Sequence, residues 1–236
     1  MTRLDLTLPD PALNLALDEA LLLAAEEHEG PEVLRFWESP VPMVVLGAGG
    51  SVAIDVNRPA CEAAAVPILR RASGGGTVLL GPGCLGYSLI LRMDRAPGLH
   101  HIQPSIRYVL SRMLKALALP CSVVEGTSDL AVNDRKFSGS AQQRKRSHFL
   151  HHGTLLHDFD LAAVARFLNP PERQPDYRRA RPHTEFLMNL PVSVAEVKQR
   201  LLAEWEPERE LTDIPLERAE QLASEKYRRD EWTFRR

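Results

Sequence analysis

The sequence predicts an α+β fold, in which helices are interspersed among the strands of a sheet built mostly from hairpins. Helical and strand-like segments follow one another without an internal repeat. The turns between the apolar runs of residues 34–91 are too short for helical crossovers, which favours antiparallel pairing. With 236 residues and 44% apolar content, the chain can bury a sizeable core within the size range of one domain. We therefore expect a single domain over residues 1–236, with no accessory domain after it.

The first half of the chain predicts two helices around a run of strands. Asp10 fits the N-cap of the first helix, Pro11 fits its first turn, and apolar residues then recur at helical spacing. Apolar runs follow up to Leu91, and we expect them to form strands. Pro104 opens the second helix, whose apolar face is made by Ile106, Leu110, Met113, Leu114 and Leu117.

The second half predicts a hairpin, a third strand and further helices. Asn133-Asp134 indicates a turn between DLAV and KFSGSA, and the alternation from Phe149 to Leu156 indicates a strand. Asp160 caps a short helix through Leu168, and the stretch NPPERQPDYRRARPH predicts an exposed loop. The last helices are expected after a capping box at Ser193 and Glu196 and over residues 216–227.

Composition narrows the class of protein. The net charge of −2 gives no sign of nucleic-acid binding, although Arg144-Lys145-Arg146 is a local basic run. That run is either a solvated loop or a contact for an acidic carrier domain or a phosphate. Three cysteines without a CxxC or metal-ligand spacing fit a reduced compartment, and no metal site is expected. No secretory signal and no apolar run of about 20 residues is present, so we expect a cytoplasmic protein without a membrane partner.

The segment RRASGGGTVLL, residues 70–80, carries a candidate anion site. Glycines accept positive φ angles and let a ligand approach the main chain, so the N–H groups of Gly74 to Gly76 can converge on an anion such as a phosphate. The alternative is a plain hairpin connection between two apolar runs. The segment has neither the GxxxxGK[ST] nor the GxGxxG spacing of the common nucleotide motifs.

Two later segments add polar groups that could face the same ligand. Lys136 lies at the start of a strand, between a polar turn and a tract of small residues that leaves room for a ligand. In HHGTLL, Gly153 lies inside a strand, where a glycine often marks the close approach of a ligand or another backbone. The alternatives are a solvated lysine at a strand edge and surface histidines at positions 151 and 152.

Taken together, the motifs RRASGGGTV, GPGCLGYSL, SDLAVNDRKFSGSAQ and HHGTLL closely resemble, in order and spacing, the catalytic domain of lipoate-protein ligase A and its lipoyl- and octanoyl-transferring relatives. The resemblance extends to NLALDE near the amino end and to Lys226-Tyr227 with Trp232 near the carboxyl end, and so covers nearly the whole chain. It implies an α+β fold with a mixed, largely antiparallel sheet flanked by helices, similar to biotin ligases and class II aminoacyl-tRNA synthetase cores.

The resemblance also implies a reaction. A ligase of this kind joins lipoate to AMP from ATP with Mg²⁺, and then passes the lipoyl group to a lysine of a lipoyl-carrier domain, such as the glycine cleavage H protein or the E2 component of a 2-oxoacid dehydrogenase. Lys136 would be the catalytic residue, lying against the acyl carbonyl and the phosphate. Arg71 would offer a charge to the phosphate. The remaining substrate- or nucleotide-binding residues would be Ser73, Gly74, Gly75, Gly76, Thr77, Val78, Leu79, Asp129, Ser138, Gly139, His152, Gly153 and Thr154.

Two departures from the ligase pattern leave alternatives open. No accessory domain follows, so either a separate polypeptide supplies it or the protein makes no adenylate. Where ligases commonly have a histidine and an acidic residue, this chain has Leu80-Gly81-Pro82-Gly83. The alternative enzyme is an octanoyltransferase that moves octanoate from acyl carrier protein through a thioester on Cys121, fifteen residues before Lys136. The favoured interpretation of Cys121 itself is that it only starts a strand, as a buried small residue. A catalytically silent lipoyl-domain binding protein is the least favoured, because Lys136 is retained.

Overall fold

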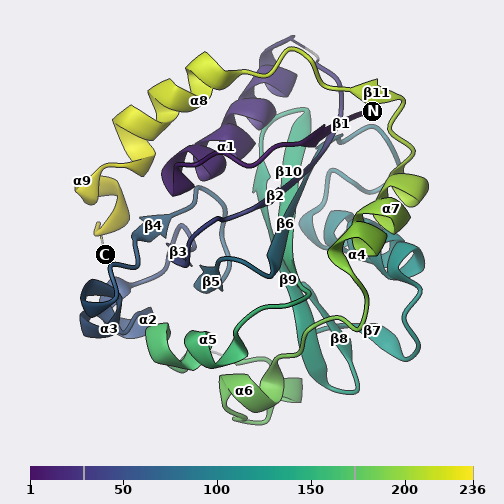
Figure 1. Cartoon of the computed structure of the whole chain (residues 1–236). Coiled ribbons are helices and arrows are strands. Elements are labelled where there is room, and N and C mark those ends of the chain that lie inside the picture. Colours follow the sequence, from purple (N-terminus) through teal and green to yellow (C-terminus); the bar gives the residue numbers. More distant parts are fainter. Residues whose placement is uncertain (29, 173, 236) are drawn as a thin grey trace.

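An eight-stranded sheet forms the centre of the computed structural model, which describes residues 1–28, 30–172 and 174–235 (Figure 1). The strands lie in the order β11, β1, β2, β6, β10, β9, β8 and β7. Within the described residues, β1 pairs in parallel with β11 and β2, and the other neighbouring pairs are antiparallel. The predicted mixed, largely antiparallel sheet is confirmed. Its strands are β1 (Thr2–Asp5), β2 (Val33–Glu38), β6 (Cys84–Arg92), β7 (Ser122–Glu125), β8 (Asp129–Val132), β9 (Arg135–Arg144), β10 (His148–Leu156) and β11 (Arg209–Glu210).

A second, three-stranded sheet carries the glycine segment. It consists of β4 (Ile68–Arg70), β3 (Met43–Leu46) and β5 (Val78–Leu80), with β3 in the middle. β3 pairs in parallel with β4 and in antiparallel fashion with β5. The glycines between β4 and β5 therefore do not close a hairpin, because another strand separates the two. The hairpin alternative is wrong for this segment.

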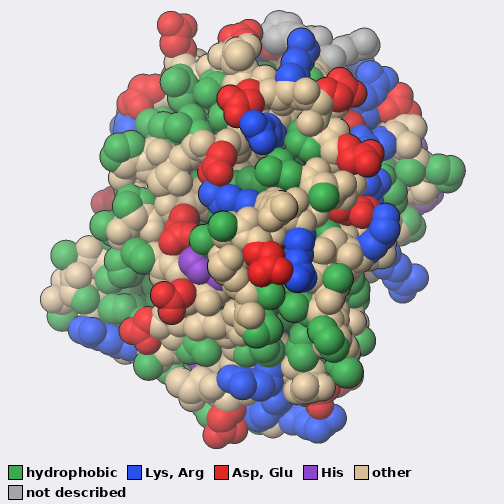
Figure 2. All heavy atoms as spheres, turned by 45° about the vertical axis from the view of Figure 1, so that its right-hand side comes forward, with side chains coloured by type: hydrophobic (Ala, Val, Ile, Leu, Met, Phe, Trp, Pro, Cys, Tyr) green, Lys and Arg blue, Asp and Glu red, His purple; other side chains and the backbone are tan. Residues whose placement is uncertain are grey.

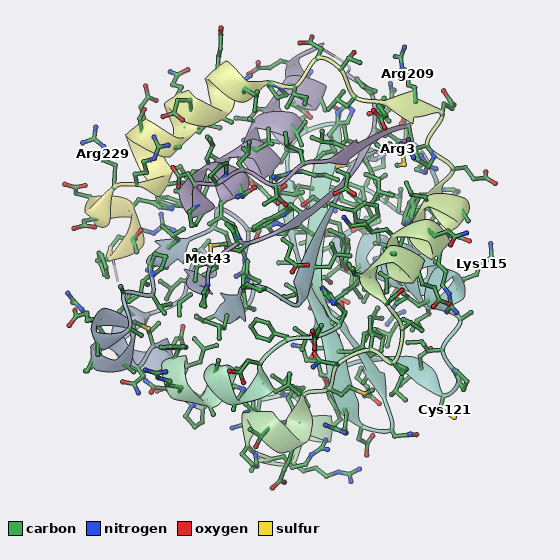
Figure 3. All side chains as sticks on the ribbon, in the orientation of Figure 1. Arg3, Met43, Lys115, Cys121, Arg209 and Arg229 are labelled. Carbon is green, nitrogen blue, oxygen red and sulfur yellow. The ribbon has the colours of Figure 1, made fainter. Side chains whose placement is uncertain are left out.

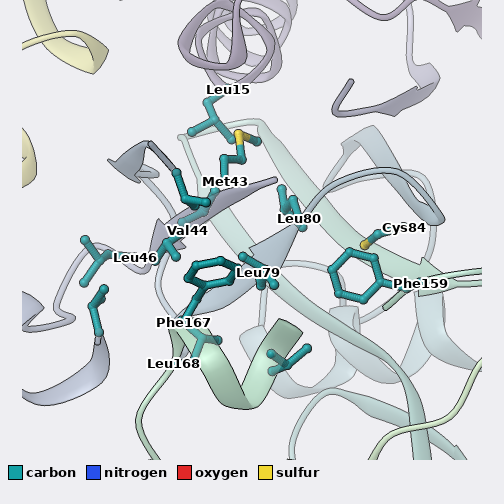
Figure 4. Packing of buried hydrophobic residues seen from close by; sticks show 14 of the residues in the cluster. Leu15, Met43, Val44, Leu46, Leu79, Leu80, Cys84, Phe159, Phe167 and Leu168 are labelled. Atoms are coloured by element: carbon teal, nitrogen blue, oxygen red, sulfur yellow. The ribbon is translucent and has the colours of Figure 1, made fainter. Parts of the chain in front are cut away.

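Helices cover both faces of the large sheet (Figure 1). α1 (Pro11–His28) and α8 (Leu216–Leu222) lie on the face that also carries the small sheet, and α4 (Ile102–Leu117) and α7 (Val194–Trp205) lie on the other. Figure 4 shows Leu15 of α1 above the strands of the small sheet, with Phe167 below them. The remaining helical segments are α2 (Val52–Asp55), α3 (Arg58–Ala63), α5 (Leu161–Phe167), η1 (Asp176–Arg178), α6 (His183–Phe186), η2 (Ala223–Tyr227) and α9 (Asp230–Thr233).

Local capping signals place most helix starts correctly. The Asp10 carboxylate accepts from the N–H of Ala12 at 2.8 Å, and Asp160 accepts from two N–H groups at the start of α5. The Ser193 hydroxyl accepts from the N–H of Glu196 at 3.2 Å. α4 differs slightly, because it begins at Ile102 and Pro104 lies inside its first turn, where no backbone donor is needed.

The sequence predicts an exposed loop at NPPERQPDYRRARPH, residues 169–183, but part of this segment is buried. It contains η1 and ends at the first residue of α6, and its side chains Tyr177 and Arg178 are buried, as is Phe186 of α6. The aromatic rings of Tyr177 and Phe186 lie 5.1 Å apart, and the Arg178 guanidinium lies over the Phe186 ring. These apolar contacts fold the segment against the large sheet, which its composition does not reveal.

The carboxyl-terminal segment is tied to β4 and to α1. The buried Arg70 guanidinium donates to the Thr233 carbonyl at 2.7 Å and to the Gly50 carbonyl at 2.7 Å. The Tyr227 hydroxyl and the Lys226 ammonium both donate to Glu19 of α1. The last described residues therefore hold the small sheet against the rest of the protein.

The surface is mixed in charge. Acidic and basic side chains are interspersed on the face in Figure 2, as expected for a net charge of −2. Among the described residues, no helix has the length and apolar character that crossing a membrane requires.

A fully buried ion pair joins α1 to the large sheet. The Arg35 guanidinium of β2 lies 2.6 Å from the Asp18 carboxylate of α1, and both side chains are almost completely removed from solvent. Arg35 also donates to the backbone and side chain of Asn14. Because each charge is neutralised by the other, removal of one residue leaves the other as a buried charge without its ion-pair partner.

We predict that Arg35→Leu lowers the free energy of unfolding by about 3–5 kcal/mol, because the Asp18 carboxylate loses its buried partner. Arg3→Leu is the matched control, since its pair with Glu210 is exposed and its loss should cost no more than about 1 kcal/mol. Urea denaturation of the two variants measures the difference. Equal losses of unfolding free energy would show that the buried Arg35–Asp18 pair stabilises the protein no more than the exposed Arg3–Glu210 pair.

Candidate active site

Lys136 is the second residue of β9, close to the β8–β9 turn, and it pairs with a carboxylate of β8. Asn133 and Asp134 both have positive φ angles, of 49° and 60°, as a tight hairpin turn requires. The Lys136 ammonium lies 2.8 Å from Asp129 Oδ1, and only a quarter of its side chain is exposed. A Cβ at Gly139 would lie 2.8 Å from Lys136 Nζ, so the glycine makes room for the lysine. The predicted hairpin is confirmed, and it holds Lys136 in an ion pair.

Two cavities meet at Lys136. The smaller has a volume of about 170 Å³ and the larger a volume of about 650 Å³. Both are bounded by one common set of residues, so a ligand in either cavity reaches the same lysine. That set consists of Gly76, Thr77, Val78, Asp129, Lys136, Gly139 and Thr154.

The smaller cavity lies between α1, the glycine segment and the large sheet. Its walls include the apolar side chains Leu15, Trp37 and Leu80. The polar side chains of Asp18, Ser88 and His152 also border it. An apolar slot of this kind suits a hydrocarbon chain whose reactive end meets the lysine.

A series of side-chain hydrogen bonds holds the polar groups of this cavity in place. His152 Nδ1 lies 3.2 Å from Asp18, and His152 Nε2 lies 2.6 Å from the Ser73 hydroxyl. Burial alone would raise the pKa of the Asp18 carboxyl, but Arg35, His152 and Ser88 together hold that pKa below its usual value. The order resembles a serine–histidine–aspartate triad. Ser73, however, is buried and lines neither cavity, so its hydroxyl ties the glycine segment to the sheet.

Arg71 holds the glycine segment in place through hydrogen bonds. Its guanidinium donates to the carbonyls of Gly74 at 2.6 Å and Gly76 at 2.8 Å, and to the Ser73 hydroxyl at 3.0 Å. Burial lowers the pKa of Arg71 to about 10. Gly75 has a φ angle of 86°, which favours glycine. Although Arg71 borders the smaller cavity, most of its donors are therefore already used within the protein.

The larger cavity has polar groups on two sides. On one side, Asp55 accepts from the Thr77 hydroxyl at 2.8 Å. On the other, Arg178 and His183 come from the segment that folds back over the sheet. Arg178 is buried, and no described carboxylate forms an ion pair with it or perturbs its pKa, which burial lowers. An unpaired guanidinium beside a cavity is suited to bind an anion.

The other predicted site residues differ in which cavity they border. Leu79 and Ser138 border only the larger cavity, Gly75, His152 and Gly153 border only the smaller, and Val78, Gly139 and Thr154 border both. A Cβ at Gly153 would lie 2.6 Å from the Tyr87 hydroxyl and 2.7 Å from the Gly139 carbonyl, so this glycine permits close packing within the sheet. Gly74 and Ser73 border neither cavity, and both accept hydrogen bonds from Arg71.

Cys121 lies apart from these cavities. It is exposed, it immediately precedes β7, and it borders none of the cavities found among the described residues (Figure 3). The two remaining cysteines, Cys61 and Cys84, are buried, and burial raises the pKa of both thiols. None of the three thiols therefore faces Lys136 across a cavity.

The basic run at 144–146 also lies away from Lys136, at the opposite end of the β9–β10 hairpin. Arg144 donates to the Leu99 carbonyl at 2.6 Å and to the Ser105 hydroxyl at 2.9 Å, so it is a structural residue. Glu26 accepts from the backbone N–H of Arg146. The run is not placed to meet a ligand in either cavity.

Sequence reasoning missed several residues that border the cavities. Asp18 lies in the recognised NLALDE motif, but its inward direction depends on the buried Arg35, which no local pattern reveals. Arg178 and His183, which border the larger cavity, lie in the segment expected to be exposed, and so does the buried Tyr177, which borders neither of the two cavities. Tyr177 donates its hydroxyl to Asp129 Oδ2 at 2.8 Å. In the described part of the chain, no group of three or more histidine, cysteine, aspartate or glutamate side chains is placed to hold a metal ion.

Known proteins match this chain over most of its length. The family model of the lipoyl protein ligase A/B catalytic domain matches residues 10–206. A probable lipoate-protein ligase A of Mycoplasma genitalium is 34% identical over 160 residues, which cover 68% of this chain and 47% of that protein. This chain thus spans about half the length of that relative. Octanoyltransferase LipM of Halalkalibacterium halodurans is 29% identical over 266 residues, covering 96% of each protein.

Solved structures show the same fold. A lipoate protein ligase of Thermoplasma acidophilum, described as bi-partite and studied with its E2 lipoyl domain, has a TM-score of 0.83 at 21% identity, and the match covers 99% of this chain and 95% of that one. A lipoate-protein ligase A bound with ATP has a TM-score of 0.80 at 22% identity, over 99% and 98%. Since the family model spans the glycine segment, Lys136 and both cavities, the chain belongs to the lipoyl protein ligase A/B catalytic domain family.

Proposed function

We propose that this chain is the catalytic domain of a lipoate-protein ligase, which activates lipoate with ATP and Mg²⁺ to lipoyl-AMP and transfers the lipoyl group to a lysine of a lipoyl-carrier domain. The observation that carries the proposal is the position of Lys136 where a small, mainly apolar cavity meets a larger one whose wall includes the charged or polar side chains of Asp55, Arg178 and His183. The first suits an acyl chain and the second a nucleotide. Names of relatives support the same choice, since they include lipoate-protein ligases and one with ATP bound.

Lys136 is suited to both halves of the reaction. An ammonium has three donors, and Asp129 uses one of them. The other two can reach the acyl carbonyl oxygen and the phosphate oxygen, where negative charge grows as the carboxylate attacks ATP and again as the acceptor amine attacks the adenylate. In the first step a carboxylate oxygen bonds to the α-phosphorus of ATP and the bond to pyrophosphate breaks. In the second step the acceptor amine forms the amide bond with the carbonyl carbon and loses a proton, and the bond from that carbon to the phosphate oxygen breaks to release AMP.

Arg178 is the better candidate for a phosphate contact than Arg71. Arg71 already donates to carbonyls of the glycine segment, whereas Arg178 borders the larger cavity without a described carboxylate partner. The main-chain edge at Gly76 and Thr77 borders both cavities, and it supplies a surface that the adenylate can follow from one to the other. The role of Arg71 is then to hold that edge in place.

The acceptor and any accessory subunit follow from the same proposal. The acceptor is a lysine on the lipoyl domain of a 2-oxoacid dehydrogenase E2 component or on the glycine cleavage H protein. The Thermoplasma ligase is described as bi-partite and with an E2 lipoyl domain, which supports both an E2-type acceptor and a separate accessory polypeptide. The chain itself is proposed to act as one catalytic domain.

A second candidate is an octanoyltransferase, because the LipM relative aligns with this chain over 96% of both lengths. The placement of the thiols argues against a thioester on this chain, since Cys121 lies outside the cavities and the other two are buried. The deciding assay supplies a lipoyl domain with either lipoate, ATP and Mg²⁺, or octanoyl-acyl carrier protein without ATP. Acylation from the first pair supports the ligase, and acylation from the second alone contradicts it.

We predict that Lys136→Ala lowers the transfer rate about a hundred- to a thousandfold, since it removes donors at two developing charges. Lys145→Ala is the control, because Lys145 lies at the other end of the same hairpin and should retain wild-type activity. Initial rates of lipoyl-domain acylation, followed by mass spectrometry, measure the effect. Retention of more than about a tenth of the activity would contradict the central role of Lys136.

A pair of glycine variants tests whether the cavity edge contacts the ligand. A Cβ at Gly74 or Gly76 meets no atom within 4 Å, but only Gly76 of these two borders the cavities. We predict that Gly76→Val weakens binding of a non-hydrolysable acyl-adenylate at least about tenfold through steric exclusion, and that Gly74→Val leaves affinity within about twofold. Calorimetry measures the affinity of both variants for the analogue. Equal affinities would mean that the glycines allow the backbone conformation and do not contact the ligand.

Cys121→Ser separates the two enzymes. If the lipoyl group passes directly from the adenylate to the acceptor lysine, the variant keeps at least about half of the wild-type rate, because an exposed thiol is replaced by a hydroxyl of similar size. Intact-mass analysis of wild-type protein mixed with octanoyl-acyl carrier protein should show no acyl adduct. A hydroxylamine-sensitive adduct on Cys121, together with an inactive variant, would establish the thioester route instead.

A further inference from the structure

Tyr177 contacts the catalytic pair from a distant part of the chain. Its hydroxyl donates to Asp129 Oδ2 at 2.8 Å, while Asp129 Oδ1 lies 2.8 Å from Lys136 Nζ. The phenol is 8% exposed. Burial, followed by the neighbouring Asp129 charge, raises the pKa of Tyr177 above its usual value, so the hydroxyl stays protonated and acts as a donor.

The segment that carries Tyr177 is fastened to the Lys136 hairpin from both sides. The Arg181 guanidinium donates to the carbonyls of Tyr177 and Asp134 at 2.9 and 2.7 Å. The N–H of Met188 donates to the Lys136 carbonyl at 2.9 Å. The Phe186 ring packs against the Tyr177 ring. Hydrogen bonds therefore hold the backbone around Tyr177 against the Lys136 hairpin, and packing on Phe186 directs the Tyr177 hydroxyl toward Asp129.

We propose that Tyr177 is a positioning residue for acyl transfer at Lys136 and that it acts through Asp129. This rests on the proposed function, in which the reacting groups meet at Lys136. A carboxylate bound through one oxygen to Tyr177 has a fixed plane, and its other oxygen therefore holds the ammonium in one direction. The two remaining protons of Lys136 then point toward the junction of the cavities, where the acyl carbonyl and the phosphate would lie.

Tyr177→Phe tests this directly, because it keeps the ring that packs on Phe186 and removes the hydroxyl. We expect kcat to fall about ten- to a hundredfold, the range for losing a hydrogen bond to a charged group, while KM for the acyl substrate stays within about twofold. Tyr108→Phe is the matched control, since Tyr108 lies on α4 and accepts from Arg95 and Arg112 on the opposite face of the sheet. Wild-type kcat in Tyr177→Phe would overturn the proposal.

A double-mutant cycle with Asp129→Ala tests the route of action. If Tyr177 acts through Asp129, adding Tyr177→Phe to Asp129→Ala lowers kcat by less than about twofold. Losses that multiply independently would show that Tyr177 acts by another path and would also overturn the proposal. The assay is run with the substrate pair that the wild-type protein uses.

A third measurement does not depend on which reaction the protein performs. Limiting acetic anhydride labels lysines in proportion to their accessibility and freedom, and Lys115, with 75% of its side chain exposed, serves as the internal reference. We expect the ratio of Lys136 to Lys115 labelling to rise about threefold in Tyr177→Phe, because the released carboxylate holds the ammonium less often, and to stay unchanged in Tyr108→Phe. An unchanged ratio in Tyr177→Phe would contradict the positioning role even if the ligase assignment stands, and a raised ratio would support it even if that assignment fails.

Discussion

The buried pair of Arg35 and Asp18 is the interaction on which the site depends, because a continuous chain of hydrogen bonds begins there. Asp18 holds His152, and His152 holds the Ser73 hydroxyl. Ser73 in turn accepts from Arg71, which grips the carbonyls of the glycine segment. The edge of both cavities is thus connected to the centre of the large sheet by charged and polar groups that are largely buried. A buried polar network of this kind is stable when its members have hydrogen-bond partners. Here it orients the backbone of the glycine segment without filling either cavity.

Space around Lys136 is created by glycines, which have no side chain. Gly139 leaves room for the lysine itself, Gly153 leaves room for Tyr87 against the neighbouring strand, and Gly76 leaves the passage between the cavities open. Gly139 and Gly153 lie within strands, and a Cβ at either position would lie less than 3 Å from a neighbouring atom. The weaker strand propensity of glycine is offset by the long antiparallel pairing of β9 and β10 on both sides of these gaps.

Much of the fold could be predicted because its signals are local. Caps at Asp10, Asp160 and Ser193 and the Asn133-Asp134 turn act within a few residues, so a single sequence displays them. The insertion of β3 between β4 and β5 could not be predicted in this way, since the strands meet across more than twenty residues. The same holds for the site. Lys136 and the glycines follow from motifs, whereas Tyr177 and Arg178 are buried by packing on Phe186, and a composition rich in proline and charge gives the opposite expectation.

The attachment of β4 to the carboxyl-terminal segment sets the order in which the molecule can be completed during synthesis. Arg70 binds carbonyls at Trp232 and Thr233, which leave the ribosome after nearly all other described residues. The small sheet, and with it one wall of each cavity, therefore reaches its final packing only after Thr233 has been made. A contact that spans so much of the sequence also carries a large loop-closure cost, so this step belongs late in folding. The nascent chain consequently passes through a stage in which the Lys136 hairpin is formed but the wall opposite it is not yet fixed.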